Sequence, residues 1–499
     1  MAFLGIDIGT SGCKALVLSD TGEVLATHTA TYGMDQPHPG WTEQDPALWI
    51  EGARQTVVQV LQTVPADDIT AVGLSGQMHG FTPVDAKGAV LRPAILWNDQ
   101  RNAAEARDIV ELAGGADALL ALTNNQMLVG YTGGKILWMQ RHEPELFDKV
   151  RHALNPKDYL RFVLTGEIAT EVSDASGTGL FDVRSRTWCA PLLDRLPFDA
   201  DILPPCYESA YVSGTVSAKS AELFGLKVGT PVIGGGGDSV IQTLGSGVAE
   251  PGVLQTTIGT GGILATALRA PEDNTGGRLQ VFCNVAPDLW HGMGVSLNSG
   301  GALGWLRKTV CPDLSFDDMM QGAGEVPAGA EGLVFLPYLN GERCPHSDPS
   351  ARGAFIGLTA RHDIRHMTRA LMEGIVYAFY DIYGLMAQMG IASDLIKASG
   401  GGARSDLWRQ IQADLFDCPV VTTNGAAEGG AFGAALLAGV SKGAWATVNE
   451  AAQCCTDLTR QEPAAATQKT YRATFDVYAD LYPALQPSFA ALNQLGARS

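Results

Sequence analysis

The stretch 231–239, PVIGGGGDS, combines a buried strand end, four glycines, a carboxylate and a hydroxyl. Four consecutive glycines are unfavourable inside a helix or strand, because glycine has no side chain to pack and loses the most backbone entropy on folding. They suit a place where another group approaches the backbone closely. Asp238 is then placed to accept a proton from a small polar substrate, with Ser239 beside it. The alternative is a glycine-rich turn in which Asp238 only caps the next helix.

Two strand–turn–strand units in the chain share one pattern. FLGIDI and KALVL flank the turn Gly9–Gly12, and VLQTTI and ILATAL flank the turn Gly259–Gly262. Both predict a hairpin whose turn presents backbone N–H groups and hydroxyls to an anion, with Lys14 adding charge to the first. Neither is a P-loop, because no GxxxxGK[ST] precedes a helix. The repetition predicts two similar α/β domains that face each other across a cleft.

Asp7 lies inside the apolar strand that leads into the first turn. A carboxylate in so apolar a strand needs a partner or a metal ion. The simpler interpretation is a carboxylate that closes the turn.

Polar residues follow two further apolar segments. ITAVGL (69–74) runs into SGQMHG (75–80), and residues 95–101 read ILWNDQR. The first places Met78 and His79 at a strand end, although a lone histidine is more often structural than catalytic. The second offers Trp97 as an aromatic wall and Asn98 as donor and acceptor for hydroxyl recognition. The alternative for this segment is a surface turn with an internal Asp–Arg pair.

The last third of the chain contains a further glycine turn and a small-residue helix. IKASGGG (396–402) precedes the amphipathic helix ARSDLWRQIQADLF, and EGGAFGAALLAG (428–439) permits close backbone approach. Glycine turns that lead into helix N-termini favour nucleotide binding, but no GxGxxG supports a dinucleotide site. His362 and His366 are spaced as metal ligands, yet no third ligand accompanies them. The tail, 469–495, predicts an amphipathic helix interrupted at Pro483.

The composition limits the partners and the location. The chain has 499 residues and a formal net charge of −19, with no basic run, so a nucleic acid or an anionic membrane is disfavoured as a partner. The nine cysteines show no CxxC spacing, which argues for reduced thiols. The N-terminus lacks the basic segment of a signal peptide, and no apolar run reaches transmembrane length. We therefore predict a globular, cytoplasmic protein of two to four domains.

Together the motifs resemble the FGGY family of carbohydrate kinases nearly from end to end. GIDIGTSGCKALVL and TTIGTGGIL are similar to the two phosphate hairpins, and ASGGGARSDLWRQIQAD to the adenosine-binding turn. GYTGGKILWMQRH (130–142) and the stretch 353–373 fit the two family signatures. GQMHG, ILWNDQR and NPKDYLRFVLTGE narrow the resemblance to members that act on D-xylulose.

The resemblance implies two actin-like (ribonuclease H-like) domains, residues 1–248 and 249–499, each a mixed sheet flanked by helices. Asp238 would be the general base, and Asp7 would organise Mg²⁺ against the transferred phosphoryl group, with Asp238 as a second metal-binding carboxylate. The implied ATP and sugar contacts are, for the phosphates, Thr10, Ser11, Lys14, Gly259, Thr260, Gly261 and Gly301; for adenosine, Gly401, Gly402 and Asp406; and for the sugar, Met78, His79, Trp97, Asn98, Asp238 and Ser239.

One residue departs from the family pattern. Members that act on D-xylulose usually carry Asn after the catalytic Asp, where this chain has Ser239. A hydroxyl offers one donor, so we expect its interaction with a sugar hydroxyl to be missing or bridged by water, which leaves the pentulose open. The alternatives are a kinase for another pentulose, a hexulose or a polyol, and an actin-like ATPase without kinase activity. The expected partners are ATP and a small sugar, and a homodimer is compatible with the family.

Overall fold

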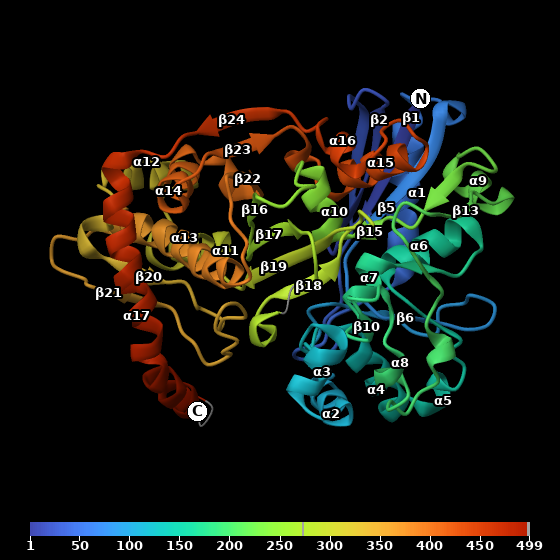
Figure 1. Cartoon of the computed structure of the whole chain (residues 1–499), viewed down its shortest axis with the longest axis horizontal. Helices are drawn as coiled ribbons and strands as arrows, with labels where there is room; N and C mark the ends of the chain where they lie inside the picture. Colours follow the sequence, from blue (N-terminus) through green and yellow to red (C-terminus); the bar gives the residue numbers. More distant parts are fainter. Residues whose placement is uncertain (272–273, 497–499) are drawn as a thin grey trace.

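Two seven-stranded mixed sheets, one from each half of the chain, organise the computed structural model, which describes residues 1–271 and 274–496 (Figure 1). The first sheet has the order β13-β14-β5-β1-β2-β3, with β15 also paired to β5, and the second has the order β18-β19-β17-β16-β22-β23-β24. The strands of the two sheets are β1 (Ala2–Ile8), β2 (Gly12–Ser19), β3 (Val24–Thr31), β5 (Ile69–Gly76), β13 (Val212–Thr215), β14 (Pro231–Ile233), β15 (Gly236–Gly237), β16 (Val253–Ile258), β17 (Gly262–Leu268), β18 (Gln280–Cys283), β19 (Trp290–Ser296), β22 (Leu395–Ser399), β23 (Val420–Thr423) and β24 (Asp457–Gln461).

The helices flank these sheets, and shorter strands pair outside them. The helices are α1 (Pro46–Val60), α2 (Ala103–Ala113), α3 (Ala116–Thr123), α4 (Thr132–His142), α5 (Pro144–Phe147), α6 (Pro156–Thr165), α7 (Val172–Ser176), α8 (Ala190–Leu193), α9 (Ala218–Phe224), α10 (Asp238–Gly245), α11 (Gly300–Val310), α12 (Phe316–Glu325), α13 (Ile364–Gln388), α14 (Asp406–Phe416), α15 (Gly430–Ser441), α16 (Val448–Ala452) and α17 (Ala465–Gly496). The short strands are β4 (Glu43–Gln44), β6 (Thr82–Val84), β7 (Ala94–Ile95), β8 (His152–Leu154), β9 (Thr170–Glu171), β10 (Phe181–Asp182), β11 (Thr187–Trp188), β12 (Cys206–Tyr207), β20 (Val334–Leu336) and β21 (Ala354–Ile356).

The two predicted hairpins form, and they occupy equivalent places in the two sheets. β1 pairs antiparallel with β2 and parallel with β5, and β16 pairs antiparallel with β17 and parallel with β22. Each turn is closed by a backbone hydrogen bond of 2.9 Å, from Gly9 N to Gly12 O in the first and from Gly259 N to Gly261 O in the second. The predicted mixed sheets in two duplicated α/β halves are confirmed.

The small-residue helix α15 joins the two halves of the chain through close backbone contact. It comes from the C-terminal half but packs on β1 and β5 of the first sheet and on α10 (Figure 1). A Cβ added to Gly5 or to Gly73 would lie 1.9 Å from a carbonyl oxygen of α15, and one on Gly433 would lie 2.1 Å from Ile241 O of α10. Only glycine permits these separations, so the sheet, α15 and α10 form one tightly packed block.

Two local expectations were wrong. The C-terminal helix α17 runs from Ala465 to Gly496 through Pro483 and Pro487 without the expected interruption. Contacts around the first proline hold it in place: the hydroxyls of Tyr478 and Tyr338 are 2.7 Å apart, and Tyr482 is buried against the same domain. The glycine cluster was expected to avoid strand structure, yet Gly236 and Gly237 pair with Ser75 and Gly76 as the short strand β15.

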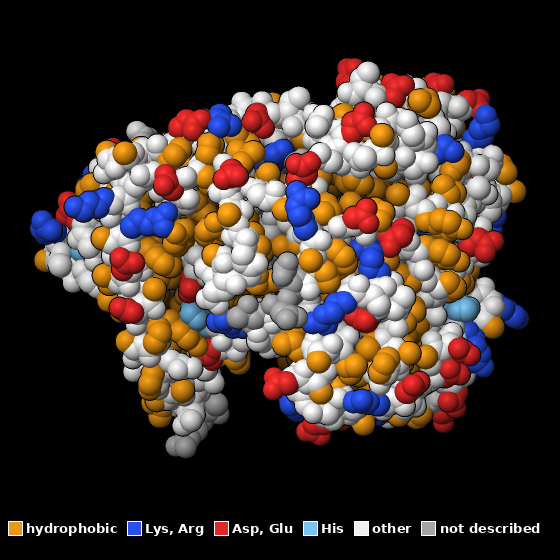
Figure 2. Space-filling model, in the orientation of Figure 1, with side chains coloured by type: hydrophobic (Ala, Val, Ile, Leu, Met, Phe, Trp, Pro, Cys, Tyr) orange, Lys and Arg blue, Asp and Glu red, His pale blue; other side chains and the backbone are white. Residues whose placement is uncertain are grey.

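The molecular surface mixes charges of both signs. On the face shown in Figure 2, Lys and Arg side chains are dispersed among Asp and Glu rather than gathered into one basic patch. Within the described residues, no helix combines the length and the apolar character needed to cross a bilayer.

The glycine-mediated packing gives a prediction on stability. Gly73→Ala should lower the free energy of unfolding by about 1–3 kcal/mol, because the added methyl group meets the Ala434 carbonyl and over-packs the block. Gly384→Ala in α13, where nothing lies within 4 Å of the added Cβ, should instead raise it by about 0.5–1 kcal/mol. Calorimetric melting of both variants checks this, and an unchanged melting temperature for Gly73→Ala would contradict the close packing.

Candidate active site

Asp238 is presented at the start of a helix by the glycine loop 234–237. β15 places Gly236 beside Ser75 of β5, and Asp238 follows as the first residue of α10. The residue that caps this helix is Gly237, and the Asp238 carboxylate accepts the Ser239 N–H at 2.7 Å. The alternative in which Asp238 is only the helix cap is therefore not the arrangement found.

Asp7 faces the same spot from the neighbouring strand. It is paired with Ser75 across β1 and β5, and the Ser75 hydroxyl donates to its Oδ1 at 2.5 Å. Gly430, at the start of α15, packs so closely that a Cβ there would lie 2.9 Å from the Asp7 carboxyl group. Burial raises the pKa of Asp7, and the Ser75 hydrogen bond and the charge of Lys14 partly oppose this.

The charge of Asp7 acts on the second carboxyl group, that of Asp238. Burial raises the pKa of Asp238 to about 7, the negative charge of Asp7 adds to this effect, and the Ser239 N–H opposes it. A carboxylate with a pKa near neutrality is suited to general-base catalysis. Two desolvated carboxylates also fit a divalent cation such as Mg²⁺, which proteins often hold with one or two carboxylates and substrate phosphates. Among the described residues, no group of three or more His, Cys, Asp and Glu side chains is arranged for a metal ion.

Met78 and His79 lie next to the Asp238 loop. The Ser239 hydroxyl donates to Met78 Sδ at 3.1 Å, and a Cβ on Gly237 would lie 2.6 Å from the same sulfur. The hydroxyl that replaces the expected amide is thus directed at Met78. The structure brings Asp238, Ser239 and Met78 together.

The His79 ring is held in one tautomer. Its Nδ1 lies 2.6 Å from Gly177 O, and because a carbonyl only accepts, Nδ1 carries the proton and Nε2 is left as an acceptor. The ring stacks on Tyr131 with centroids 4.7 Å apart, and Lys135 Nζ donates to the His79 carbonyl at 2.6 Å. Burial lowers the pKa of His79 to about 3, so the ring is neutral.

Trp97 and Asn98, the two residues of ILWNDQR expected to bind the sugar, lie in different surroundings. Trp97 is 40% exposed, and its Nε1 donates to Thr10 Oγ1 at 3.0 Å, so it contacts the first hairpin turn. Asn98 lines a different pocket of about 450 Å³, formed by residues 36–42. The expected ion pair exists, since Arg101 and Asp99 are 2.8 Å apart, but it is buried rather than on the surface.

A network of glutamines fixes the first phosphate hairpin. Thr10 Oγ1 donates to Gln77 Oε1 at 3.1 Å, and Gln77 Nε2 donates to Gln44 Oε1 at 3.0 Å. Gln44 Nε2 closes the network on Thr10 O at 2.9 Å. Gln44 and Gln77, which the sequence reasoning did not single out, are therefore part of the turn's support. Gln77 lies inside the GQMHG motif, and this motif was the sequence signal that could have identified it.

The other two residues of the first hairpin differ in environment. Ser11 is exposed at the turn, whereas Lys14 Nζ lies 3.0 Å from Glu428 Oε2, just before α15. Glu428 partly neutralises the charge that Lys14 would offer to a phosphate.

A cavity of about 770 Å³ lies beside the second hairpin, and this volume suits a nucleotide-sized ligand. It brings together most of the residues expected to contact ATP on this side: Gly259, Thr260, Gly301, Gly401, Gly402 and Asp406. Gly261 is not among its lining residues. The cavity also has apolar walls that the sequence reasoning missed, among them Leu303, Phe316, Met320 and Trp408. No sequence signal linked α12, which carries two of these residues, to the glycine turn.

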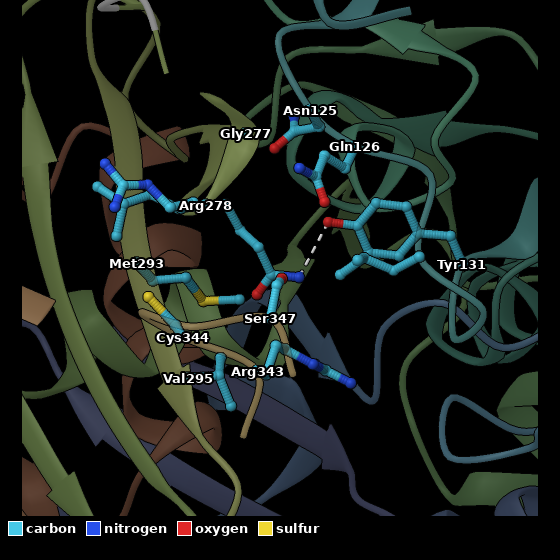
Figure 3. Close-up of a pocket in the computed structure, with 13 residues that line it drawn as sticks. Asn125, Gln126, Tyr131, Gly277, Arg278, Met293, Val295, Arg343, Cys344 and Ser347 are labelled. Carbon is cyan, nitrogen blue, oxygen red and sulfur yellow. Dashed lines mark hydrogen bonds between the residues drawn. The ribbon is translucent and has the colours of Figure 1, made fainter. Parts of the chain in front are cut away.

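A polar contact zone lies between the two halves of the chain (Figure 3). Gln280 Nε2 of β18 donates to the Tyr131 hydroxyl at 2.9 Å, and a cavity of about 10 Å³ beside them, lined also by Arg343, has room for one water. One face of the Tyr131 ring stacks on His79, so this zone adjoins a residue expected to bind the sugar.

The i,i+4 histidines are not arranged as metal ligands. His366 lies 2.8 Å from Asp363 at the start of α13, and its ring centroid is 5.3 Å from that of His362.

Comparison with known proteins identifies relatives along almost the whole chain. Models of the FGGY family of carbohydrate kinases match residues 2–245 (N-terminal domain) and residues 254–442 (C-terminal domain). A xylulose kinase of Bacillus subtilis is 36% identical over 482 residues, 96% of each chain. A crystal structure described as a xyloylose kinase from Brucella ovis has a TM-score of 0.92 at 34% identity, covering 98% of this chain and 100% of that one. A gluconate kinase from Lactobacillus acidophilus has a TM-score of 0.93 at 27% identity, covering 98% and 99%.

The environment of His79 gives a prediction on protonation. Because burial disfavours the imidazolium and lowers the pKa to about 3, the ring should remain neutral between pH 5 and 9. In protein labelled with ¹³C-histidine, the Cε1 resonance that disappears in His79→Gln should not move across this range. A titration of this resonance with a midpoint near 6.5 would show that the ring is solvated.

Proposed function

The chain belongs to the FGGY family of carbohydrate kinases, and on that premise we propose that it transfers the γ-phosphoryl group of ATP to the 5-hydroxyl of D-xylulose. The observation that carries the proposal is Asp238 at the end of the glycine loop, facing Asp7 and with its pKa raised to about 7. The names of the relatives support xylulose as the sugar.

The reaction needs one proton transfer and one displacement. The Asp238 carboxylate takes the proton of the sugar hydroxyl while the hydroxyl oxygen forms a bond to the γ-phosphorus and the bond from phosphorus to the leaving oxygen of ADP breaks. The products are D-xylulose 5-phosphate, ADP and one proton. His79 Nε2 is placed to accept a hydrogen bond from another sugar hydroxyl. The Ser239 hydroxyl is already hydrogen-bonded to Met78 Sδ, so its interaction with the sugar would be weaker.

The ATP phosphates are proposed to lie between the two hairpin turns. Thr10 and Ser11 would contact them from one side, and Gly259 and Thr260 from the other, with adenosine in the cavity at Gly401. Asp7 and Asp238 would hold Mg²⁺, which when bound neutralises charge on the β- and γ-phosphates. An acidic chain needs such local neutralisation to bind ATP.

The domain division and the location of the protein also remain proposals. Residues 1–248 would supply the sugar side, the first hairpin and the base, and residues 249–499 would supply the second hairpin and the adenosine cavity. We place the enzyme in the cytoplasm, where ATP is available. A homodimer stays an expectation from the family.

Sugar dependence of ADP release is the direct test of the function. With Mg-ATP, D-xylulose should give the highest kcat/KM in a panel with L-xylulose, D-ribulose, L-ribulose, D-gluconate and glycerol, and the blank without sugar should be low. Preference for another sugar would keep the reaction but change the assigned substrate, and Ser239 would be the first residue to test as its cause. Preference for D-gluconate would agree with the Lactobacillus relative. Equal release with and without every sugar would favour an actin-like ATPase.

Asp238→Asn tests the role of the base. The amide keeps the shape and an acceptor for the Ser239 N–H but cannot take a proton, so kcat should fall by about 10²–10⁴-fold. The thermal shift caused by ATP should remain, which shows that the variant is folded and binds nucleotide. Turnover close to that of the parent enzyme would end the assignment.

Gly401→Leu tests the nucleotide cavity. Gly401 lines the cavity, and among the described residues the nearest neighbour of an added Cβ is Ile258 O at 3.9 Å, so the larger side chain should occupy the space proposed for adenosine. The KM for ATP should rise by roughly 10-fold or more, because displacing the base from the cavity walls exposes apolar surface at about 25 cal/mol per Å². Gly384→Leu, in open space on α13, is the matched control and should leave this KM unchanged.

A further inference from the structure

A buried cluster of charges lies behind the glycine loop, outside the candidate catalytic pair. Lys157 Nζ lies 2.6 Å from Asp158 Oδ1, 3.4 Å from Asp174 Oδ2 and 3.7 Å from Glu171 Oε1. All four side chains are at most 1% exposed. Three carboxyl groups thus surround one ammonium group in the interior.

This cluster is not explained by stability. Burial alone would lower the pKa of Lys157, but the three carboxylates raise it above its ordinary value, and burial raises the pKa of Asp174 well above its own. Removing charges from water costs several kcal/mol for each ion, and well-packed apolar side chains of similar volume are often as stable or more so. Such a cluster is therefore weak evidence for a stabilising role, and the groups that it contacts are the place to look for another role.

What the cluster holds is the backbone of the glycine loop. Lys157 Nζ donates to Gly234 O at 3.2 Å, and a Cβ on Gly234 would lie 3.0 Å from Glu171 Cβ. Glu171 Oε1 accepts the Ser173 hydroxyl at 2.8 Å, and Ser173 Oγ in turn accepts the N–H of Gly237 at 3.0 Å. Gly237 is the residue immediately before Asp238.

We propose that Ser173, oriented by Glu171 and Lys157, is a positioning residue for Asp238. The inference rests on the proposed role of Asp238 as the base. The Ser173 hydroxyl donates to Glu171, so its lone pair is directed at the Gly237 N–H and fixes the peptide that leads into Asp238. The buried charges make this orientation costly to change.

The loop needs such a restraint because of its composition. Gly234–Gly237 have no side chains to pack, and Gly235 adopts φ of +80°, a region that glycine reaches freely. Productive geometry at a catalytic group tolerates about 0.5 Å, and a misplacement of about 1 Å can cost about 10²-fold in rate. The hydrogen bond from Gly237 to Ser173 restrains the residue immediately before the catalytic carboxylate.

Ser173→Ala tests the proposal, with Ser176→Ala as a matched control. Both serines are buried in α7, and each accepts one backbone N–H at 3.0 Å, from Gly237 and from Cys283 respectively. Both variants should lose thermal stability, and Ser173→Ala somewhat more, because the Ser173 hydroxyl donates to the Glu171 carboxylate and the Ser176 hydroxyl to the Val172 carbonyl. Only Ser173→Ala should lower kcat strongly, by roughly 10- to 100-fold, with the KM for ATP changed less than about twofold. Ser176→Ala should lower kcat less than about threefold.

Further variants keep the result interpretable. If Ser173→Ala does not fold, Ser173→Cys, whose thiol is a weaker acceptor than the hydroxyl, should fold. Its kcat should lie between that of the parent enzyme and the roughly 10- to 100-fold lower value expected for Ser173→Ala. Equal kcat in Ser173→Ala and Ser176→Ala, with Asp238→Asn inactive, would overturn the positioning role and leave the proposed function intact. An active Asp238→Asn would instead overturn the role of Asp238 as the base, and the positioning role of Ser173 with it, whereas the panel of sugars tests the phosphoryl transfer separately.

Discussion

The placement of two carboxylates, Asp7 and Asp238, against each other is the constraint on which the rest of the site depends. Like charges in a partly desolvated place repel, and each would be more stable alone in water. The sheet keeps them close: Ser75 is the neighbour of Asp7 on one side and of Gly236 on the other, and Asp238 follows two residues after Gly236. Burial raises the pKa of both carboxyl groups, and the negative charge of Asp7 raises that of Asp238 further.

The packing behind the carboxylates is unusually close. α15 lies against Gly5 and Gly73 of the sheet and against α10, which carries Asp238. Its N-terminus also contacts Asp7 through Gly430. One helix from the C-terminal half thus contacts the elements that bear both carboxylates.

The sequence reveals those parts of the molecule that depend on local pattern. The hairpins, the glycine turns and the helix 430–441 could be predicted because apolar runs and glycines mark them within a few residues. Features that depend on distant residues could not. Lys14 meets Glu428 from far along the chain, and the pocket lined by Asn98 does not include Met78 or His79. The hydrogen bond between Ser173 and Gly237 joins segments 64 residues apart, with no local signal.

The contact between β18 and the N-terminal half has a consequence beyond the active site. β18 is an edge strand of the second sheet, and its outward backbone groups are capped by side chains rather than by another strand. Asn125 accepts the Val281 N–H at 2.9 Å and donates to the Val281 carbonyl at 2.7 Å, and Ser176 Oγ accepts the Cys283 N–H at 3.0 Å. Unpaired edges are templates for strand addition between molecules. Side chains of the N-terminal half therefore leave these backbone groups of β18 unavailable for strand addition by another molecule.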